Sequence, residues 1–195
     1  MTLPGEHILA GFTLGFRHRH ELARVMRNVS VDSSVLGIDP LMFKSLGITT
    51  LALDFDGVLA PHGFDAPLPE VCEWLCRCVK TFGEQDIFIL SNKPTLERQQ
   101  WFAENFPCIR FISGVRKKPL PDGLVKIGEL AGVPLSSILM VDDRLFTGCL
   151  GAINAGACVC YIRRPYISLS HQFLAEMFFI LMRKGERLVV GCGSF

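Results

Sequence analysis

The 195-residue chain lacks an uninterrupted apolar run long enough to cross a membrane, which takes ~18–20 residues. Its most apolar stretch, Phe173 to Met182, holds nine apolar residues in ten and is followed by Arg183. A stretch of that length predicts a helix that is buried or lies at an interface. No transmembrane segment is expected.

The chain also lacks an excess of charge of either sign. It carries 20 Lys and Arg against 19 Asp and Glu, and 49% of its residues are hydrophobic. This balance excludes a disordered chain and argues against a general nucleic-acid binder. The length suits one folded domain without low-complexity linkers. We expect an N-terminal arm over residues 1–35 and a single domain over 36–195 that includes the C-terminal apolar helix.

Cysteine is too sparse for a disulfide scaffold, with eight residues in the whole chain. The opening segment MTLPGEHILAGF has neither the basic start nor the cleavage site that is typical of a signal peptide. We therefore expect reduced thiols and a cytoplasmic protein.

Apolar segments alternate with helical patterns along the rest of the chain. Asp39 before Pro40 predicts a helix start, and Pro69 opens a second helix whose apolar residues recur at spacings of three and four. Strands are predicted at 48–54, 86–91, 109–112, 137–141 and 157–162, and helices at 40–46, 69–82, 95–106, 121–131 and 144–155. Single helices between strands indicate an α/β fold, a Rossmann-like doubly wound parallel sheet.

Polar side chains follow four of the predicted strands. They are Asp54 and Asp56 after the first, Ser91 and Asn92 after the second, Lys117 and Lys118 beyond the third, and Asp142 and Asp143 after the fourth. Ligands of doubly wound sheets bind outside the carboxyl ends of the strands. The sequence thus predicts one site that contains carboxylates, a hydroxyl group and a lysine.

These residue types suit phosphoryl transfer. Carboxylate oxygens favour Mg²⁺, which offsets the charge of a phosphate group. With that charge reduced, an aspartate can act as the nucleophile and form an aspartyl-phosphate. A second carboxylate two residues away can protonate the leaving oxygen and then activate water. Asp54 and Asp56 have this spacing, and Gly57 permits the tight turn between them.

The segments ALDFDGVL, ILSN, KKP and ILMVDD resemble, in order, the four motifs of the haloacid dehalogenase (HAD) phosphatase superfamily. Three longer segments are similar to the YqeG-type branch, which includes phosphatidylglycerophosphate phosphatases: GIDPLMFKSLGITTLALDFDGVLAP, FISGVRKKPLPDGL and DDRLFTGCLGAINAGACVCYIRRP. The resemblance implies a Mg²⁺-dependent phosphomonoesterase with the HAD fold.

The resemblance also implies a role for each site residue. Asp54 would be the nucleophile and a metal ligand, and Asp56 the acid and base whose backbone carbonyl also reaches the metal. Lys118 would stabilise the phosphoryl charge, with Lys117 the less favoured choice. Asp143 would hold the metal.

Two further residues complete the substrate side of the implied site. By the same resemblance, Ser91 would bind the phosphate oxygens, and Asn92 would lie beside it.

One departure from the branch leaves two interpretations open. The related pattern reads roughly GDQLFTD, so Asp142 stands where glycine is usual and Gly148 where a second aspartate is usual. Either Asp142 supplies the supporting carboxylate to the metal site, or metal affinity is reduced. The second interpretation suggests an alternative function, a catalytically weak HAD-like scaffold that binds a partner.

The spacing of the motifs leaves no room for a sizeable cap domain. Only 34 residues separate Asp56 from Ser91, and 26 separate Ser91 from Lys118. An open pocket suits a phosphate group on something large, such as a lipid, a protein or a polymer end. Phosphatidylglycerophosphate is the substrate that the resemblance favours.

The C-terminal segment is apolar and flanked by basic residues: Arg163, Arg164, Arg183, Lys184 and Arg187. One interpretation is a last helix that packs on the sheet or forms a homodimer. The other is an interfacial helix that makes a peripheral contact with anionic lipid at the inner face of a membrane.

Overall fold

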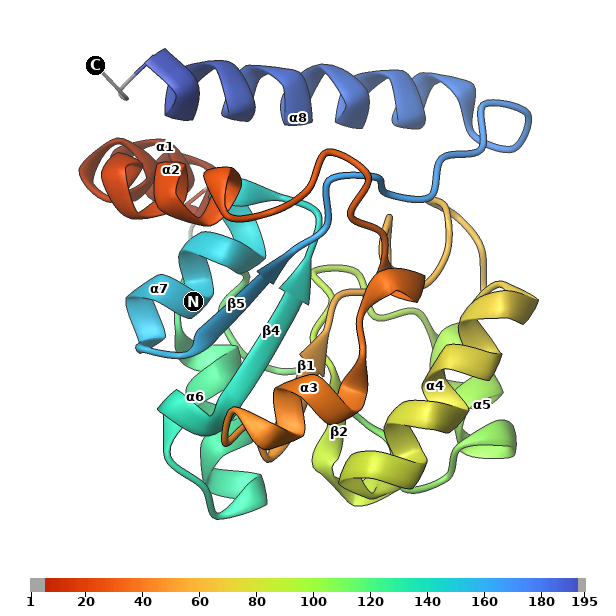
Figure 1. Ribbon diagram of the computed structural model, residues 1–195. Helices are drawn as coiled ribbons and strands as arrows, with labels where there is room; N and C mark the ends of the chain where they lie inside the picture. Colours follow the sequence, from red (N-terminus) through yellow and green to blue (C-terminus); the bar gives the residue numbers. More distant parts are fainter. Residues whose placement is uncertain (1–5, 193–195) are drawn as a thin grey trace.

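The computed structural model describes residues 6–192, which form a parallel sheet covered by helices on both faces (Figure 1). The strands are β1 (Thr50–Leu53), β2 (Ile87–Ile89), β3 (Arg110–Phe111), β4 (Ile138–Asp142) and β5 (Cys158–Tyr161). They lie in the order β3-β2-β1-β4-β5, and every pair is parallel. The predicted α/β fold with a doubly wound sheet is confirmed.

Eight α-helices connect and flank these strands within the described residues. They are α1 (Glu6–Arg17), α2 (Arg19–Arg27), α3 (Pro40–Ser45), α4 (Pro69–Phe82), α5 (Leu96–Asn105), α6 (Asp122–Ala131), α7 (Leu150–Ala155) and α8 (Phe173–Cys192). A π-helical turn, Leu145–Cys149, precedes α7, so the single helix predicted over 144–155 is only partly correct.

Local signals explain where several helices begin. Asp39 accepts a hydrogen bond from the backbone N–H of Leu41, 3.0 Å away, directly before Pro40. The Thr95 hydroxyl accepts one from the N–H of Arg98 at 3.3 Å. Side-chain oxygens at these positions satisfy backbone donors that the first helical turn leaves free. The predicted starts of α3 and α5 are therefore confirmed.

The sheet is apolar on both faces because helices cover both. Leu51 and Leu53 point to one face, where Trp74 of α4 and Phe102 of α5 pack. Ala52 points to the other face, which α6 and α7 cover. Alternate residues of one strand thus reach two separate cores, which accounts for continuous apolar runs in the strands.

Helix α2 lies beside α8, and α1 packs on α2 (Figure 1). Leu22 and Ala23 of α2 are buried in a third apolar cluster, with Leu145 and Leu150 around the π-helical turn and Val190 of α8. This packing joins the two ends of the described chain.

Helix α8 lies across the edge of the sheet at which β4 ends (Figure 1). Its buried residues include three charged ones, Glu176, Arg183 and Glu186. Several of its apolar residues point outward instead: Leu174 is 82% exposed and Leu181 63%. The apolar character of this segment therefore does not come from packing on the sheet.

No helix within residues 6–192 is long and apolar enough to cross a membrane. The segments between the predicted motifs hold one α-helix each, α4 and α5, with short turns. The expected absence of a large cap domain is confirmed for the described chain.

Candidate active site

The predicted site residues come together where the chain order of the strands reverses. β1 lies between β2 and β4, and the segments that leave β1 and β4 meet at the carboxyl edge of the sheet. A cavity of about 230 Å³ opens there, and six of the predicted residues line it: Asp54, Asp56, Ser91, Asn92, Lys118 and Asp143.

Two predicted residues do not line this cavity. Asp142 is fully buried behind it, at the end of β4. Lys117 lines a neighbouring cavity with Arg116 and Leu120. The structure thus places Lys118, the favoured choice of the two lysines, among the carboxylates.

Lys118 links two of these carboxylates. Its Nζ lies 2.9 Å from Oδ1 of Asp54 and 2.6 Å from Oδ2 of Asp142. Burial lowers the pKa of Lys118, but the Asp142 and Asp54 carboxylates outweigh burial, so the pKa ends above its ordinary value. The ammonium group therefore stays charged, and it offsets the cost of burying both aspartates.

Asn92 fixes the backbone of Lys118. Its Oδ1 accepts a hydrogen bond from the Lys118 N–H at 2.9 Å, and its Nδ2 donates to the Lys118 carbonyl at 3.4 Å. Ser91 is buried next to it, and its Oγ accepts from the N–H of Lys93 at 3.1 Å. The amide group of Asn92 thus positions the lysine.

Three carboxylates form a cluster that fits a metal ion. Asp54, Asp142 and Asp143 each offer an oxygen within 4.8 Å of the others. Oδ1 of Asp143 is buried and has no hydrogen-bond partner among the described residues. An all-oxygen donor set with an unsatisfied buried acceptor suits a hard divalent cation such as Mg²⁺.

Without a bound metal ion, two carboxyl groups of the cluster have raised pKa values. Burial raises the pKa of Asp54 well above its ordinary value, and Lys118 only partly opposes this. Burial also raises the pKa of Asp143 to about 6, although Arg183 lowers it. A cation at this cluster would have to displace protons from the carboxyl groups.

The structure explains why glycine stands at position 148. A Cβ atom on Gly148 would lie 1.9 Å from Oδ2 of Asp142. The Asp142 carboxylate therefore fills the space that a side chain at position 148 would need. Of the two interpretations left open, the geometry favours the one in which Asp142 supplies the second carboxylate.

Gly57 is also required by its surroundings. Its φ is +82°, and a Cβ there would lie 2.6 Å from Oδ2 of Asp143. The glycine allows the turn after Asp56 to approach the carboxylate cluster closely.

Asp56 has a partner that sequence reasoning missed. Both of its oxygens accept hydrogen bonds from Arg98 of α5, at 3.0 Å from Nη1 and 2.7 Å from Nη2. The guanidinium also lies over the Phe55 ring, 3.9 Å from its centroid. Arg98 precedes the buried Phe102 by four residues, and this helical spacing was the available signal.

The residues that α8 brings to the site were missed as well. Nε of Arg183 donates to Oδ2 of Asp143 at 2.5 Å. Phe179 stacks on His62 with ring centroids 3.9 Å apart, and both line the cavity. Charged residues at helical spacing in an otherwise apolar segment were the signal.

A second buried contact fixes α8 against the π-helical turn. Glu186 accepts hydrogen bonds from the Arg144 guanidinium, at 2.8 Å from Nε, and from the Leu145 N–H at 3.0 Å.

Comparisons with known proteins identify a family for most of the chain. The family model of the haloacid dehalogenase-like hydrolases matches residues 35–156. No curated protein matches the chain.

Among solved structures, an uncharacterized protein from Corynebacterium glutamicum is 21% identical, covers 71% of this chain and 96% of its own, and has a TM-score of 0.47. A HAD-superfamily hydrolase from Ehrlichia chaffeensis is 12% identical, with 70% and 98% covered and a TM-score of 0.41. A haloacid dehalogenase-like family hydrolase from Streptococcus pneumoniae is 13% identical, with 69% and 99% covered and a TM-score of 0.39.

The raised pKa values predict a pH-dependent metal affinity. As the pH falls through about 6, Asp143 takes up a proton that Mg²⁺ must displace. Calorimetric titration should show Mg²⁺ affinity falling at least ~10-fold between pH ~7 and ~5, with protons released on binding. Exposed Asp65 provides a control, because Asp65→Asn should leave the dependence unchanged. An affinity that is constant over this range would contradict the assignment of the cluster.

The contact between Asp142 and Gly148 predicts the outcome of exchanging them. Gly148→Asp alone should lower the free energy of unfolding by about 3 kcal/mol, because the new side chain overlaps the Asp142 carboxylate. The double variant Asp142→Gly/Gly148→Asp should recover most of this loss in urea unfolding. The single variant Asp142→Gly completes the comparison. If the double variant loses as much free energy of unfolding as the two single variants together, the two positions do not share one space.

Proposed function

The chain belongs to the haloacid dehalogenase-like hydrolases, and on that premise we propose that it is a Mg²⁺-dependent phosphomonoesterase that forms an aspartyl-phosphate on Asp54. The observation that carries the proposal is the position of Lys118, whose Nζ lies between the carboxylates of Asp54 and Asp142 at the cavity. A phosphate group entering this cavity meets a fixed cation next to a carboxylate nucleophile.

In the first step, a carboxylate oxygen of Asp54 attacks phosphorus while the bond from phosphorus to the leaving oxygen breaks. Asp56 gives its proton to that oxygen, which leaves as an alcohol. Lys118 balances the negative charge that Asp54 and the phosphate group bring together. Ser91 lies at the same cavity, and its hydroxyl group can donate to a phosphate oxygen.

In the second step, Asp56 takes a proton from a water molecule as that water attacks phosphorus. The bond to Asp54 breaks, inorganic phosphate leaves, and the Asp54 carboxylate is restored. Arg98 bears on both steps, since each oxygen of Asp56 accepts one of its hydrogen bonds. Arg98 therefore orients the carboxyl group that takes part in both proton transfers.

Mg²⁺ would be held by Asp54, Asp143 and the Asp56 carbonyl with Asp142 in support, and when bound it would neutralise phosphate charge. In the structure Arg183 contacts Asp143 from α8, so the chain itself supplies a cation to this carboxylate.

The substrate we propose is phosphatidylglycerophosphate or another phosphate group carried on a large molecule. The YqeG-type segments and the absence of a large cap support this choice. The cavity borders α8 at Ala175 and Phe179, and the outer side of the same helix exposes apolar residues. This arrangement would place the catalytic cavity close to a lipid surface.

The alternative function, a catalytically weak scaffold, depends on the missing carboxylate at position 148. The Asp142 carboxylate lies in the space beside Gly148 and contacts Lys118, which supports the enzyme over the scaffold.

The nucleophile is tested by Asp54→Asn. The amide has the same volume but cannot attack phosphorus, so hydrolysis of an aryl phosphate should fall at least ~1000-fold with little change in unfolding temperature. Asp65→Asn, at an exposed position on the loop after β1, serves as the matched control. Residual activity within ~10-fold of the wild type would contradict the proposed mechanism.

The substrate class is tested by comparing a lipid with a soluble phosphate. Binding energy from the glycerol headgroup and the interface should make kcat/KM for phosphatidylglycerophosphate in mixed micelles at least ~100-fold higher than for the aryl phosphate. Equal efficiency on the two substrates would rule out the lipid and leave a phosphatase with another target.

A further inference from the structure

A second cavity, of about 340 Å³, lies on the flank of α8 and shares no lining residue with the catalytic one. Five of its lining residues are basic: Arg163, Arg164, Arg183, Lys184 and Arg187. The others are proline and isoleucine, and no acidic residue lines it within the described chain. We call it the basic cavity. All its residues lie outside the range that the family model matches.

Arg183 lines the basic cavity and at the same time contacts the carboxylate cluster through Asp143. The residue is only 4% exposed, and among the described residues it donates a hydrogen bond from Nε to Asp143. Nη1 and Nη2 are buried and have no hydrogen-bond partner among the described residues. Buried guanidinium nitrogens without acceptors cost free energy, and an anionic oxygen within reach would remove that cost.

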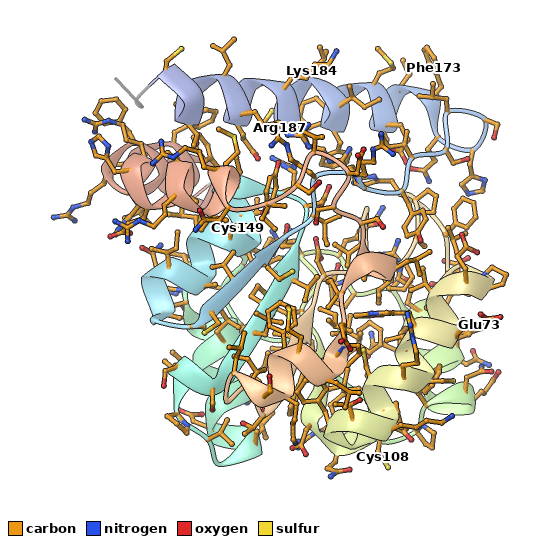
Figure 2. The ribbon with its side chains drawn as sticks, viewed as in Figure 1. Glu73, Cys108, Cys149, Phe173, Lys184 and Arg187 are labelled. Carbon is orange, nitrogen blue, oxygen red and sulfur yellow. The ribbon has the colours of Figure 1, made fainter. Side chains whose placement is uncertain are left out.

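The other cations are placed differently. Arg187 is held by two hydrogen bonds, from Nε to the Tyr161 hydroxyl at 2.8 Å and from Nη2 to the Arg163 carbonyl at 2.7 Å. Lys184 lies on the outer side of α8, whereas Arg187 lies on the side that faces the rest of the molecule (Figure 2). Arg164 is exposed and pairs with exposed Asp32 at 2.6 Å. The basic cavity thus combines fixed cations with accessible ones.

The apolar face of α8 adjoins the basic cavity. Four cavity residues recur at helical spacing and so share one flank: Ile180, Arg183, Lys184 and Arg187. Exposed Leu174, Met177, Phe178 and Leu181 share the neighbouring face by the same spacing. Phe173 begins this face on the outer side of the helix (Figure 2). A basic flank beside an apolar face is the pattern of helices that lie in the surface of a lipid bilayer.

We propose that the basic cavity binds the phosphate group of an anionic phospholipid while the apolar face of α8 enters the lipid surface. The phosphate oxygens meet the charges of the exposed Lys184 and Arg164, and the buried guanidinium of Arg183 adds its positive charge from behind. This phosphate is not the one that reacts, because the basic cavity shares no lining residue with the cavity that contains Asp54. Binding here is separate from the proposed hydrolysis and does not depend on it.

The test is flotation of the full-length protein with vesicles of phosphatidylcholine, with or without phosphatidylglycerol. The variant Arg164→Gln/Lys184→Gln removes two accessible charges, and Arg77→Gln/Lys80→Gln removes two exposed charges from α4 as the matched control. Each basic residue near an anionic surface raises the partition coefficient about fivefold. The partition coefficient of the first variant should therefore be ~30-fold lower than that of the wild type. The control variant should bind as the wild type does. Unfolding temperatures verify that the variants are folded, since exposed pairs such as Arg164 with Asp32 contribute little.

Two arms distinguish lipid from other occupants. Calorimetric titration with inorganic phosphate, without Mg²⁺, tests whether free phosphate enters the basic cavity. Weaker phosphate binding by Arg164→Gln/Lys184→Gln than by the control variant supports the phosphate site and shows that it also accepts a soluble ligand. Sedimentation without lipid tests self-association. Equal vesicle binding by all three proteins would overturn the proposal. So would a lipid-free dimer that Leu181→Ser disperses and that vesicles do not compete away.

Discussion

Burial of several carboxylates at one edge of a sheet is possible here because each one meets a cation. Lys118 lies between Asp54 and Asp142, and Arg183 contacts Asp143. Arg98 holds both oxygens of Asp56. An uncompensated buried carboxylate costs several kcal/mol, so removal of any one cation leaves the fold to bear that cost. The arrangement of charges at the site is therefore also a condition for the packing around it.

These cations come from separate parts of the chain, which ties the helices to the site. Arg98 belongs to α5 and Arg183 to α8. Because α8 turns Glu176, Arg183 and Glu186 inward, many of its apolar residues are left on the outer side. The same helix thus closes one side of the catalytic cavity, carries the flank of the basic cavity and presents an apolar face. Its contact with Asp143 connects these features physically.

Features that depend on neighbours in sequence were predictable. Asp39 and Thr95 cap helices because a side-chain oxygen and nearby N–H groups suffice, and the strands ended where polar residues began. The contacts of Arg98 and Arg183 were not predictable, since each depends on which distant carboxylate the fold brings near. Helix α8 exposes an apolar face and buries charged residues, which is the opposite of the usual arrangement. The close approach of Gly148 to Asp142 depends on how β4 and the π-helical turn pack, which the order of residues does not reveal.

Attack by Asp54 on phosphorus is tested most directly by trapping the intermediate. An aryl phosphate reaction with the Mg²⁺-loaded protein is quenched in acid during turnover and treated with borohydride, which reduces an acyl phosphate to an alcohol. Peptide mapping by mass spectrometry should then find homoserine in place of Asp54 and aspartate unchanged at Asp56, Asp142 and Asp143. Reduction at another carboxylate, or phosphate release with no reduced residue at position 54, would contradict the role given to Asp54.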